Sequence, residues 1–124
     1  MCVFCKIVNK EIPATIVYED DLSIAILDIN PLTKGHTLVM PKEHYEDLLD
    51  CPKELLKHLI EVSQIVANKI INDNDAKGIN LVQNSKVEAG QEVFHLHFHL
   101  IPRYHENELT PFKRNEMGFM FAVG

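Results

Sequence analysis

The sequence lacks the features that mark several large classes of protein. It has no cluster of lysine or arginine, and its formal net charge is −6 with seven histidines counted as neutral, which argues against an electrostatic grip on long nucleic acid. Its longest apolar runs, such as residues 23–27, are too short to cross a membrane. The first five residues show no charged region leading into an apolar stretch, so no signal peptide is predicted. We therefore expect a cytoplasmic protein that binds neither nucleic acid nor membranes.

The sequence also lacks internal repeats, low-complexity segments and Gly/Ser-rich linkers. Its 124 residues, 46% hydrophobic and 24% charged, suit one folded domain and leave little room for a second. We expect a single domain over residues 1–124. Cysteine is scarce, with three residues, but Cys2 and Cys5 lie in a C-x-x-C spacing. In a reducing compartment that spacing favours a metal or redox role over a structural disulfide.

Short β-rich runs separated by turn residues predict five strands, over residues 15–19, 23–28, 36–40, 78–83 and 94–103. Between the third and fourth strands, a helix is predicted from Pro52 or Lys53 to about Asn72. Its main apolar stripe has the spacing of one helix face and consists of Leu55, Leu59, Val62, Val66 and Ile70. These elements indicate an α+β domain with a mostly antiparallel sheet. We interpret residues 105–124 as a tail that packs against a partner subunit.

The most informative segment is residues 94–101, where histidine alternates with apolar residues. Because side chains alternate between the faces of a strand, His95, His97 and His99 are predicted to share one face. Burial of three adjacent imidazoles without partners would be costly, so this face should meet solvent, a metal or a ligand. The outer two histidines would lie about 13 Å apart along a strand, which is too far to share one ion. A metal held by two alternate histidines stays open.

Imidazole chemistry favours a nucleophile in this segment. A neutral imidazole attacks phosphorus at physiological pH because its pKa is about 6.5. The resulting phosphoramidate is labile enough for water to complete the reaction. The attacking ring needs its other nitrogen fixed by a hydrogen bond, and neighbouring histidines can donate to phosphoryl oxygens as charge develops.

The chain resembles the histidine-triad (HIT) family, whose signature is H-x-H-x-H followed by apolar residues. The likeness covers nearly the whole chain. In order, the matching segments are C-x-F-C-K-I at the N-terminus, Y-E-D at 18–20, L-D-I-N-P at 27–31, G-H at 35–36, P-K at 41–42, G-Q at 90–91 and I-P-R at 101–103. Together these segments are far more specific than the triad alone.

The resemblance implies the HIT-like fold: a five-stranded, mostly antiparallel sheet with one long helix and a short N-terminal helix. It also implies a homodimer in which two such sheets join into one continuous sheet, with the long helix near the interface. The implied activity is hydrolysis of nucleoside 5′-phosphoramidates or related phosphoanhydrides of purine nucleotides through a nucleotidyl-histidine intermediate. No organic cofactor is expected, and a purine nucleoside monophosphate or nucleotide conjugate is the expected ligand.

The resemblance also implies roles for single residues. His97 is the expected nucleophile, His99 would contact the phosphate, and His36 would orient or polarise His97. Asp28 matches the position that binds the ribose hydroxyls. The remaining expected substrate contacts are Leu27 and Ile29 at the base, and Asn84, Gln91, Glu92 and Val93 in a phosphate-binding loop.

Two positions bear on the reaction. Some family members carry Ser or Thr where this chain has Glu92, and an ionised carboxylate cannot supply the hydroxyl's proton to a leaving group. Members that transfer nucleotides tend to end the triad with Gln, so the histidine at His99 favours hydrolysis.

Many microbial members of the family resemble this chain in having a zinc site. Cys2 and Cys5 supply thiolates at the spacing of a zinc knuckle, and the matching histidines are His44 and His95. A closed site with four ligands would be structural and would leave His97 and His99 for catalysis. The competing interpretation is that both cysteines are small buried hydrophobic residues.

Two other functions stay open from the sequence. One is a metal-activated hydrolase in which His97 and His99 hold a catalytic ion. The other is a non-catalytic purine nucleotide-binding dimer; the intact triad with His36 argues against it, and Glu92 keeps it open.

Overall fold

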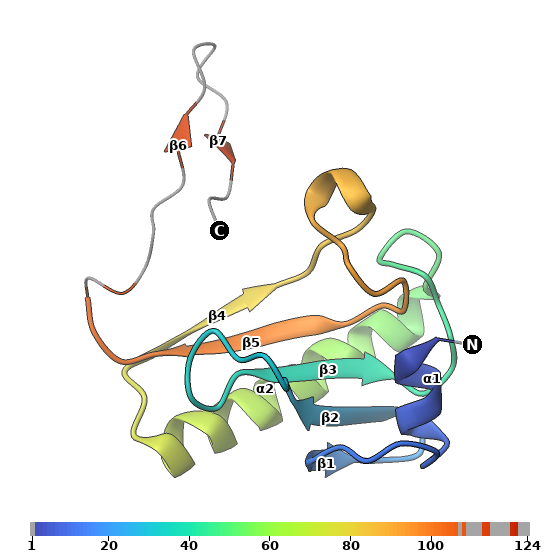
Figure 1. Ribbon diagram of the computed structural model, residues 1–124, viewed down its shortest axis with the longest axis horizontal. Coiled ribbons are helices and arrows are strands. Elements are labelled where there is room, and N and C mark those ends of the chain that lie inside the picture. The colour runs from blue at the N-terminus through green and yellow to red at the C-terminus, as the bar shows by residue number, and fades with distance from the viewer. Residues whose placement is uncertain (1, 107, 109–112, 115–119, 122–124) are drawn as a thin grey trace.

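The computed structural model describes residues 2–106, 108, 113–114 and 120–121 (Figure 1). Along the chain the elements are α1 (Val3–Val8), β1 (Ile16–Glu19), β2 (Ser23–Leu27), β3 (Thr37–Pro41), α2 (Lys53–Asn74), β4 (Gly78–Val82), the 3₁₀ turn η1 (Val87–Ala89), β5 (Phe98–Arg103), β6 (Lys113–Arg114) and β7 (Met120–Phe121). The first five strands along the chain form one sheet in the order β1-β2-β3-β5-β4, with every neighbouring pair antiparallel. The α+β class and the HIT-like arrangement are therefore confirmed.

One face of the sheet is covered by α2, which runs behind the strands in Figure 1. The predicted apolar stripe of α2 lies on this face, where Leu59, Val62, Val66 and Ile70 are buried and Leu55 is partly buried. The sheet contributes Ala25, Val39, Phe98 and Leu100 to the same core, and Leu96, just before β5, joins them. The helix ends at Asn74, two residues later than expected, and the left-handed backbone of its C-cap Asp75 (φ 54°) stops it.

The other face of the sheet carries α1. Cys2 is the N-cap of this short helix, and its sulfur accepts a hydrogen bond from the Cys5 N–H. Phe4 and Ile7, one turn apart, point from α1 into a second core. That core is completed by the alternate residues of β2 and β3, namely Ile24, Ile26, Leu38 and Met40. The N-terminal segment is thus fixed on the same side of the sheet as His97 and His99.

The prediction of a strand over residues 94–103 is wrong for its first four residues. The last β3–β5 pair joins Val39 to Phe98, and β5 begins there. The Leu96 N–H leaves the sheet and donates to the Tyr45 carbonyl at 2.7 Å. Because His95 lies in a bend, the three histidines do not line up along one strand.

Two loops meet at the same end of the sheet, the segment between β3 and α2 and the segment between β4 and β5 (Figure 1). In the described part of the chain, no helix combines the length and the hydrophobicity needed to cross a bilayer. The expected packing of residues 105–124 on a partner subunit concerns a segment of which the larger part lies outside the described residues, and it stays a prediction.

Candidate active site and metal centre

His95 is fully buried, and its two ring nitrogens have different partners. Nε2 lies 2.8 Å from the carbonyl oxygen of Pro41, so Nε2 carries the proton and donates it. Nδ1 therefore holds a lone pair. Burial lowers the pKa of His95 to about 4, which keeps the ring neutral at physiological pH. The neutral ring presents its lone pair to the sulfur atoms of Cys2 and Cys5, at 3.5 and 3.6 Å.

Four side chains form what we call the cysteine–histidine cluster: Cys2, Cys5, His44 and His95. Their ligand atoms lie within 4.8 Å of one another, and Nδ1 of His44 lies 3.3 Å from the Cys5 sulfur. In a tetrahedral zinc site with Zn–S about 2.3 Å and Zn–N about 2.0 Å, sulfur and nitrogen ligands lie about 3.5 Å apart. The residues predicted to bind zinc thus have the identity and the spacing of a closed zinc site.

His97 is almost completely buried, and one of its nitrogens is fixed by the chain itself. Nδ1 lies 2.7 Å from the carbonyl oxygen of His95 and donates to it. The lone pair of the neutral ring is therefore on Nε2. Burial lowers the pKa of His97, so this lone pair is free of a proton at neutral pH. An imidazole held in this way can act as a nucleophile through Nε2.

His36 and His99 form a hydrogen-bonded pair in which the donor and the acceptor can be assigned. The Leu32 N–H donates to Nδ1 of His36 at 3.1 Å, so the proton of the His36 ring is on Nε2. Nε2 of His36 lies 3.0 Å from Nδ1 of His99 and donates to it. The proton of His99 is then on its own Nε2. Burial lowers the pKa of both rings, that of His99 to about 4.

Asp28 lies at the end of this pair, and we call Asp28, His36 and His99 the histidine–aspartate cluster. One carboxylate oxygen of Asp28 lies 3.6 Å from Nε2 of His36, and the other accepts from the Asn30 N–H at 2.9 Å. The rings of His97 and His99 lie 4.9 Å apart, centroid to centroid. The structure thus brings together the predicted nucleophile, both predicted assisting histidines and the predicted ribose ligand.

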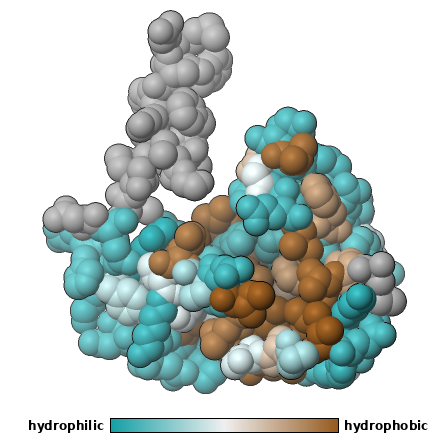
Figure 2. All heavy atoms as spheres, in the orientation of Figure 1, coloured by the Kyte–Doolittle hydropathy of each residue, from teal (hydrophilic) through white to brown (hydrophobic). Residues whose placement is uncertain are grey.

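The residues expected at the base are exposed. Ile29 is 89% exposed, and Leu27 and Leu32 are 37% and 67% exposed. Figure 2 shows hydrophobic residues gathered in the middle of this face, in the region of β2 and β3, with hydrophilic residues around them. Such an exposed apolar surface next to polar groups is typical of a ligand-binding face.

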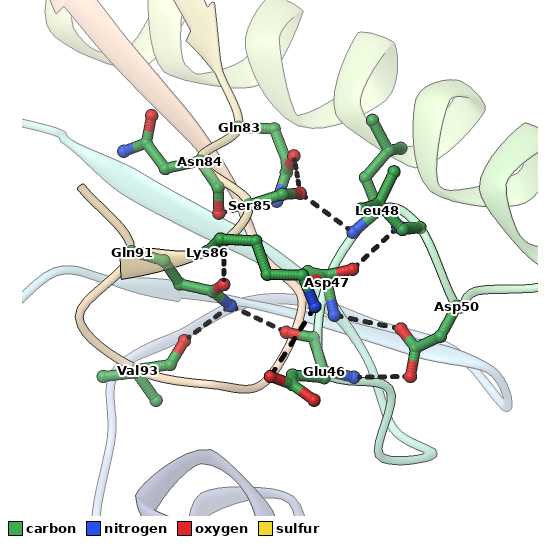
Figure 3. A network of polar contacts seen from close by, with 11 residues as sticks. Glu46, Asp47, Leu48, Asp50, Gln83, Asn84, Ser85, Lys86, Gln91 and Val93 are labelled. Carbon is green, nitrogen blue, oxygen red and sulfur yellow. Dashed lines mark hydrogen bonds and ion pairs between the residues drawn. The ribbon is translucent and has the colours of Figure 1, made fainter. Parts of the chain in front are cut away.

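The loop between β4 and β5 is held by the side chain of Gln91 (Figure 3). Its amide oxygen accepts from the Lys86 N–H at 2.7 Å, and its amide nitrogen donates to the carbonyls of Glu46 and Val93 at 2.7 and 3.1 Å. This amide is nearly buried, and both of its N–H groups and one lone pair of its oxygen are used within the protein, which leaves one lone pair. Gln91 therefore shapes the loop, and its amide has little capacity left for a ligand.

An ion pair gives the same loop a second anchor. The ammonium group of Lys86 lies 2.8 Å from the carboxylate of Asp47, which is 1% exposed. This contact lowers the pKa of Asp47 and raises that of Lys86. The backbone of Lys86 has φ 79° and ψ 156°, a conformation that is costly for any residue except glycine. Later in the same loop, Gly90 has φ 96°, a left-handed backbone that favours glycine.

The three other predicted loop residues differ in their surroundings. Asn84 is half-buried at the start of the loop, Glu92 is exposed, and Val93 is partly buried against the core under α1.

Two contacts were missed from the sequence. Phe4 packs its ring edge-on against both His95 and His97, and only the ordinary apolar spacing of α1 pointed to its burial. His58 lies 2.8 Å from Asp20 and joins α2 to the β1–β2 turn, where Asp20 also accepts from the Leu22 and Ser23 N–H groups.

Comparison with known proteins finds a matching family and relatives over most of the chain. The family model described as "HIT domain" matches residues 9–106. A protein of Borreliella burgdorferi named an uncharacterized HIT-like protein is 52% identical over 91% of this chain and 82% of its own length. Adenosine 5′-monophosphoramidase HNT1 of Saccharomyces cerevisiae is 41% identical over 85% of this chain and 64% of its own length. Adenylylsulfatase HINT3 of Arabidopsis thaliana is 41% identical over 82% of this chain and 52% of its own length.

Solved structures have the same fold. A HIT family protein from Bacillus anthracis aligns with a TM-score of 0.86 and 43% identity, over 94% of this chain and 83% of the other. A Zn-bound histidine triad family protein from Mycobacterium smegmatis aligns with a TM-score of 0.84 and 42% identity, over 93% of this chain and 83% of the other.

Proposed function

Because this chain belongs to the HIT domain family, we propose that it is a hydrolase of purine nucleotides that works through a covalent intermediate on His97. Its substrates are nucleoside 5′-phosphoramidates or related phosphoanhydrides. The relatives named adenosine 5′-monophosphoramidase and adenylylsulfatase support this class of reaction. The observation that carries the proposal is the hydrogen bond from Nδ1 of His97 to the His95 carbonyl, which leaves Nε2 as the nucleophilic atom.

The reaction has two steps at the α-phosphorus. Nε2 of His97 first forms a bond to phosphorus, and the bond from phosphorus to the leaving nitrogen or oxygen breaks with its electron pair going to the leaving group. The Nε2–H of His99 donates to a phosphoryl oxygen and stabilises the developing charge. The leaving group takes up a proton from solvent. Water then attacks phosphorus and gives up a proton to solvent, the bond to His97 breaks with its electron pair returning to Nε2, and the nucleoside monophosphate leaves.

The substrate's other parts have assigned contacts. Asp28 accepts from the ribose hydroxyls, and the exposed Ile29 with Leu27 packs against the base. The phosphate lies against the loop between β4 and β5, where Asn84 and the backbone near Glu92 and Val93 donate. Gln91 acts indirectly, because its amide is used to hold that loop.

The test replaces His97 by asparagine. Turnover of an adenosine phosphoramidate is expected to fall by about 10³-fold or more, because no other group can form the covalent bond. The matched control, His105→Asn, changes an exposed histidine after β5 and should stay within about twofold of wild type. Near-normal hydrolysis by a folded His97→Asn protein would rule the proposal out.

The two other functions predict different results. A metal-activated hydrolase with His97 and His99 as ligands would lose activity on chelation while the fold persists; the hydrogen bond that His36 donates to Nδ1 of His99 speaks against it, because the proton of His99 is then on Nε2. A non-catalytic nucleotide binder would bind a nucleoside monophosphate and turn over no phosphoramidate.

We further propose that the cysteine–histidine cluster binds a structural zinc ion, as the ligand spacing and the zinc-bound relative support. Metal analysis of the purified protein should give about one zinc per chain. Cys5→Ser should lower that ratio, and Cys51→Ser, which changes a cysteine in the α2 core, should not.

A homodimer is the last part of the proposal. Strand β4 is an edge of the sheet, with Leu81 and Val82 49% and 36% exposed, and an unpaired edge is a template for a second copy. The exposed Ile60 and the partly buried Leu56 add an apolar strip on α2. Light scattering should give twice the chain mass, and Leu81→Asp should shift it to the monomer.

A further inference from the structure

The helix α1 is bound to the sheet through the two cysteines that flank Phe4. Cys2 is its N-cap and Cys5 lies one turn later, and both sulfur atoms lie within 3.6 Å of the same nitrogen of His95. Any metal held by these sulfur atoms fixes the position of α1 relative to β5. Phe4 lies between the two cysteines in sequence, so its position is fixed along with theirs.

The ring of Phe4 contacts both histidines that the cluster and the reaction use. Its centroid lies 5.9 Å from that of His95 and 5.1 Å from that of His97, with interplanar angles of 76° and 86°. These are edge-to-face contacts, an arrangement that aromatic pairs prefer. Phe4 is 7% exposed and belongs to the core between α1 and the sheet, so its ring is confined on its other sides.

His97 is held by three contacts of different origin. Its Nδ1 is fixed by the His95 carbonyl, and the ring of His99 lies on it at 4.9 Å. The third contact is made by Phe4. Phe4 comes from α1, whereas the other two contacts come from the chain segment around β5. The hydrogen bond holds one edge of the ring, and the packing of Phe4 and His99 against it restricts rotation about the side-chain bonds further.

We propose that Phe4 is a positioning residue for His97 and that the cysteine–histidine cluster, when it holds a metal, fixes Phe4 in place. The metal site is then coupled to the nucleophile by two routes: through His95, which offers Nδ1 to the cluster and its carbonyl to His97, and through Phe4. Release of the metal loosens the His97 ring while the substrate contacts of Asp28 and the β4–β5 loop persist. This inference rests on the proposed function of His97.

The test compares Phe4→Ala and Phe4→Leu with Ile7→Ala, which removes a buried side chain from the same helix and the same core. We expect Phe4→Ala to slow single-turnover formation of the His97 adduct about tenfold, with KM changed by less than about twofold, because a misplaced group costs rate more than binding. Phe4→Leu, which refills the space, should recover most of the rate. Ile7→Ala should leave the rate within about twofold of wild type.

A second measurement tests the link to the metal and does not depend on activity. The ring protons of His97, assigned by NMR from the His97→Asn protein, should shift when Phe4 is replaced because they lose the ring current of Phe4. They should also shift when zinc is removed from wild type with a chelator, and much less when it is removed from Phe4→Ala. The adduct rates should follow the same non-additive pattern.

The outcomes separate this inference from the proposed function. If wild type forms no adduct, the proposed function fails, and the NMR measurement still decides whether Phe4 and the metal position His97. If wild type forms the adduct and a folded Phe4→Ala protein forms it equally fast, Phe4 is not a positioning residue. If zinc removal leaves the His97 resonances of wild type unchanged, the coupling to the metal site is wrong.

Discussion

Two clusters of similar composition lie on either side of His97, and they differ in where their protons are. In the cysteine–histidine cluster, Nε2–H of His95 donates a hydrogen bond to the Pro41 carbonyl, so the lone pair of Nδ1 faces the sulfur atoms. In the histidine–aspartate cluster, Nδ1 of His36 accepts from the Leu32 N–H and Nε2 donates to His99. Both sets have ligand atoms within 4.8 Å of one another. Spacing alone does not distinguish a metal ligand from a hydrogen-bond relay.

The difference shows that the partner of the second nitrogen decides what a histidine can do. A metal on Nε2 of His36 would require the ring's proton to move to Nδ1, where it would face the Leu32 N–H. Two donors facing each other lose a hydrogen bond and repel. The same residue type therefore presents a lone pair to two sulfur atoms at His95, as the proposed zinc site requires, and donates a hydrogen bond to a second histidine at His36.

The largest expected effect comes from breaking the cysteine–histidine cluster. In Cys5→Ser the zinc ion is lost, and the free energy of unfolding should fall by about 3 kcal/mol, or roughly 10 °C in Tm, because metal binding contributes directly to folding. Thermal unfolding with and without a chelator measures this. Wild type and variant should unfold alike once chelator is present; a large remaining gap between them would contradict a stabilising metal.

The next effect comes from breaking the other cluster. His36→Phe keeps a ring in the buried site but removes the hydrogen bond that sets the tautomer of His99. We expect kcat to fall by about 10- to 100-fold, less than for loss of a direct donor to the phosphate, while the zinc content stays unchanged. Steady-state kinetics and metal analysis of one preparation test both points. Loss of zinc in His36→Phe would show that the two clusters are not independent.

A change of pH affects the histidine–aspartate cluster through stability. Burial holds the pKa of His99 at about 4 and lowers that of His36, whereas an unfolded histidine titrates near about 6.5. The unfolded chain therefore binds protons first, and the contribution of His99 to the free energy of unfolding should fall by about 2 kcal/mol between about pH 6.5 and pH 4 and stay level above pH 7. Chemical denaturation of wild type and His99→Gln at pH 7.5 and pH 5 measures this. An equal loss in both proteins would exclude His99 as a source.

The smallest effect is expected from a change that touches neither cluster. Asp47→Asn removes the charge that anchors Lys86, so the β4–β5 loop should loosen and KM should rise by about three- to tenfold with kcat little changed.

The backbone at Lys86 gives a matched pair of controls. Lys86→Gly should be more stable than Lys86→Ala by about 1 kcal/mol, because only glycine adopts its positive φ without strain. Equal stability of the two would mean that this backbone is not strained.

The sequence was sufficient to predict the element types and the α2 core, because apolar spacing reports burial directly. It also placed His36, His97, His99 and Asp28 as one group through the family resemblance. The N-terminal end of β5 could not be predicted, since it depends on the capture of the Leu96 N–H by the Tyr45 carbonyl. Histidine and apolar residues also alternate over residues 94–97, which precede β5, so the sequence pattern predicted a strand there as well.

The contacts made by ordinary residues were the least predictable. Phe4 and Pro41 are residue types that indicate no function by themselves. In the fold, Phe4 packs on His97, and the carbonyl of Pro41 sets the tautomer of His95. Gln91 was expected at the phosphate, and only the fold shows that its amide is turned to Glu46 and Lys86. Residue type predicts which groups can react, and tertiary contacts decide which of their atoms are free.

The most direct test of the account is to look for the covalent intermediate. Wild type is mixed briefly with an adenosine phosphoramidate, quenched without acid, digested and analysed by mass spectrometry. The account predicts an added nucleotidyl mass on His97 that is absent from His97→Asn. Turnover with no adduct on His97 at any time point would contradict it.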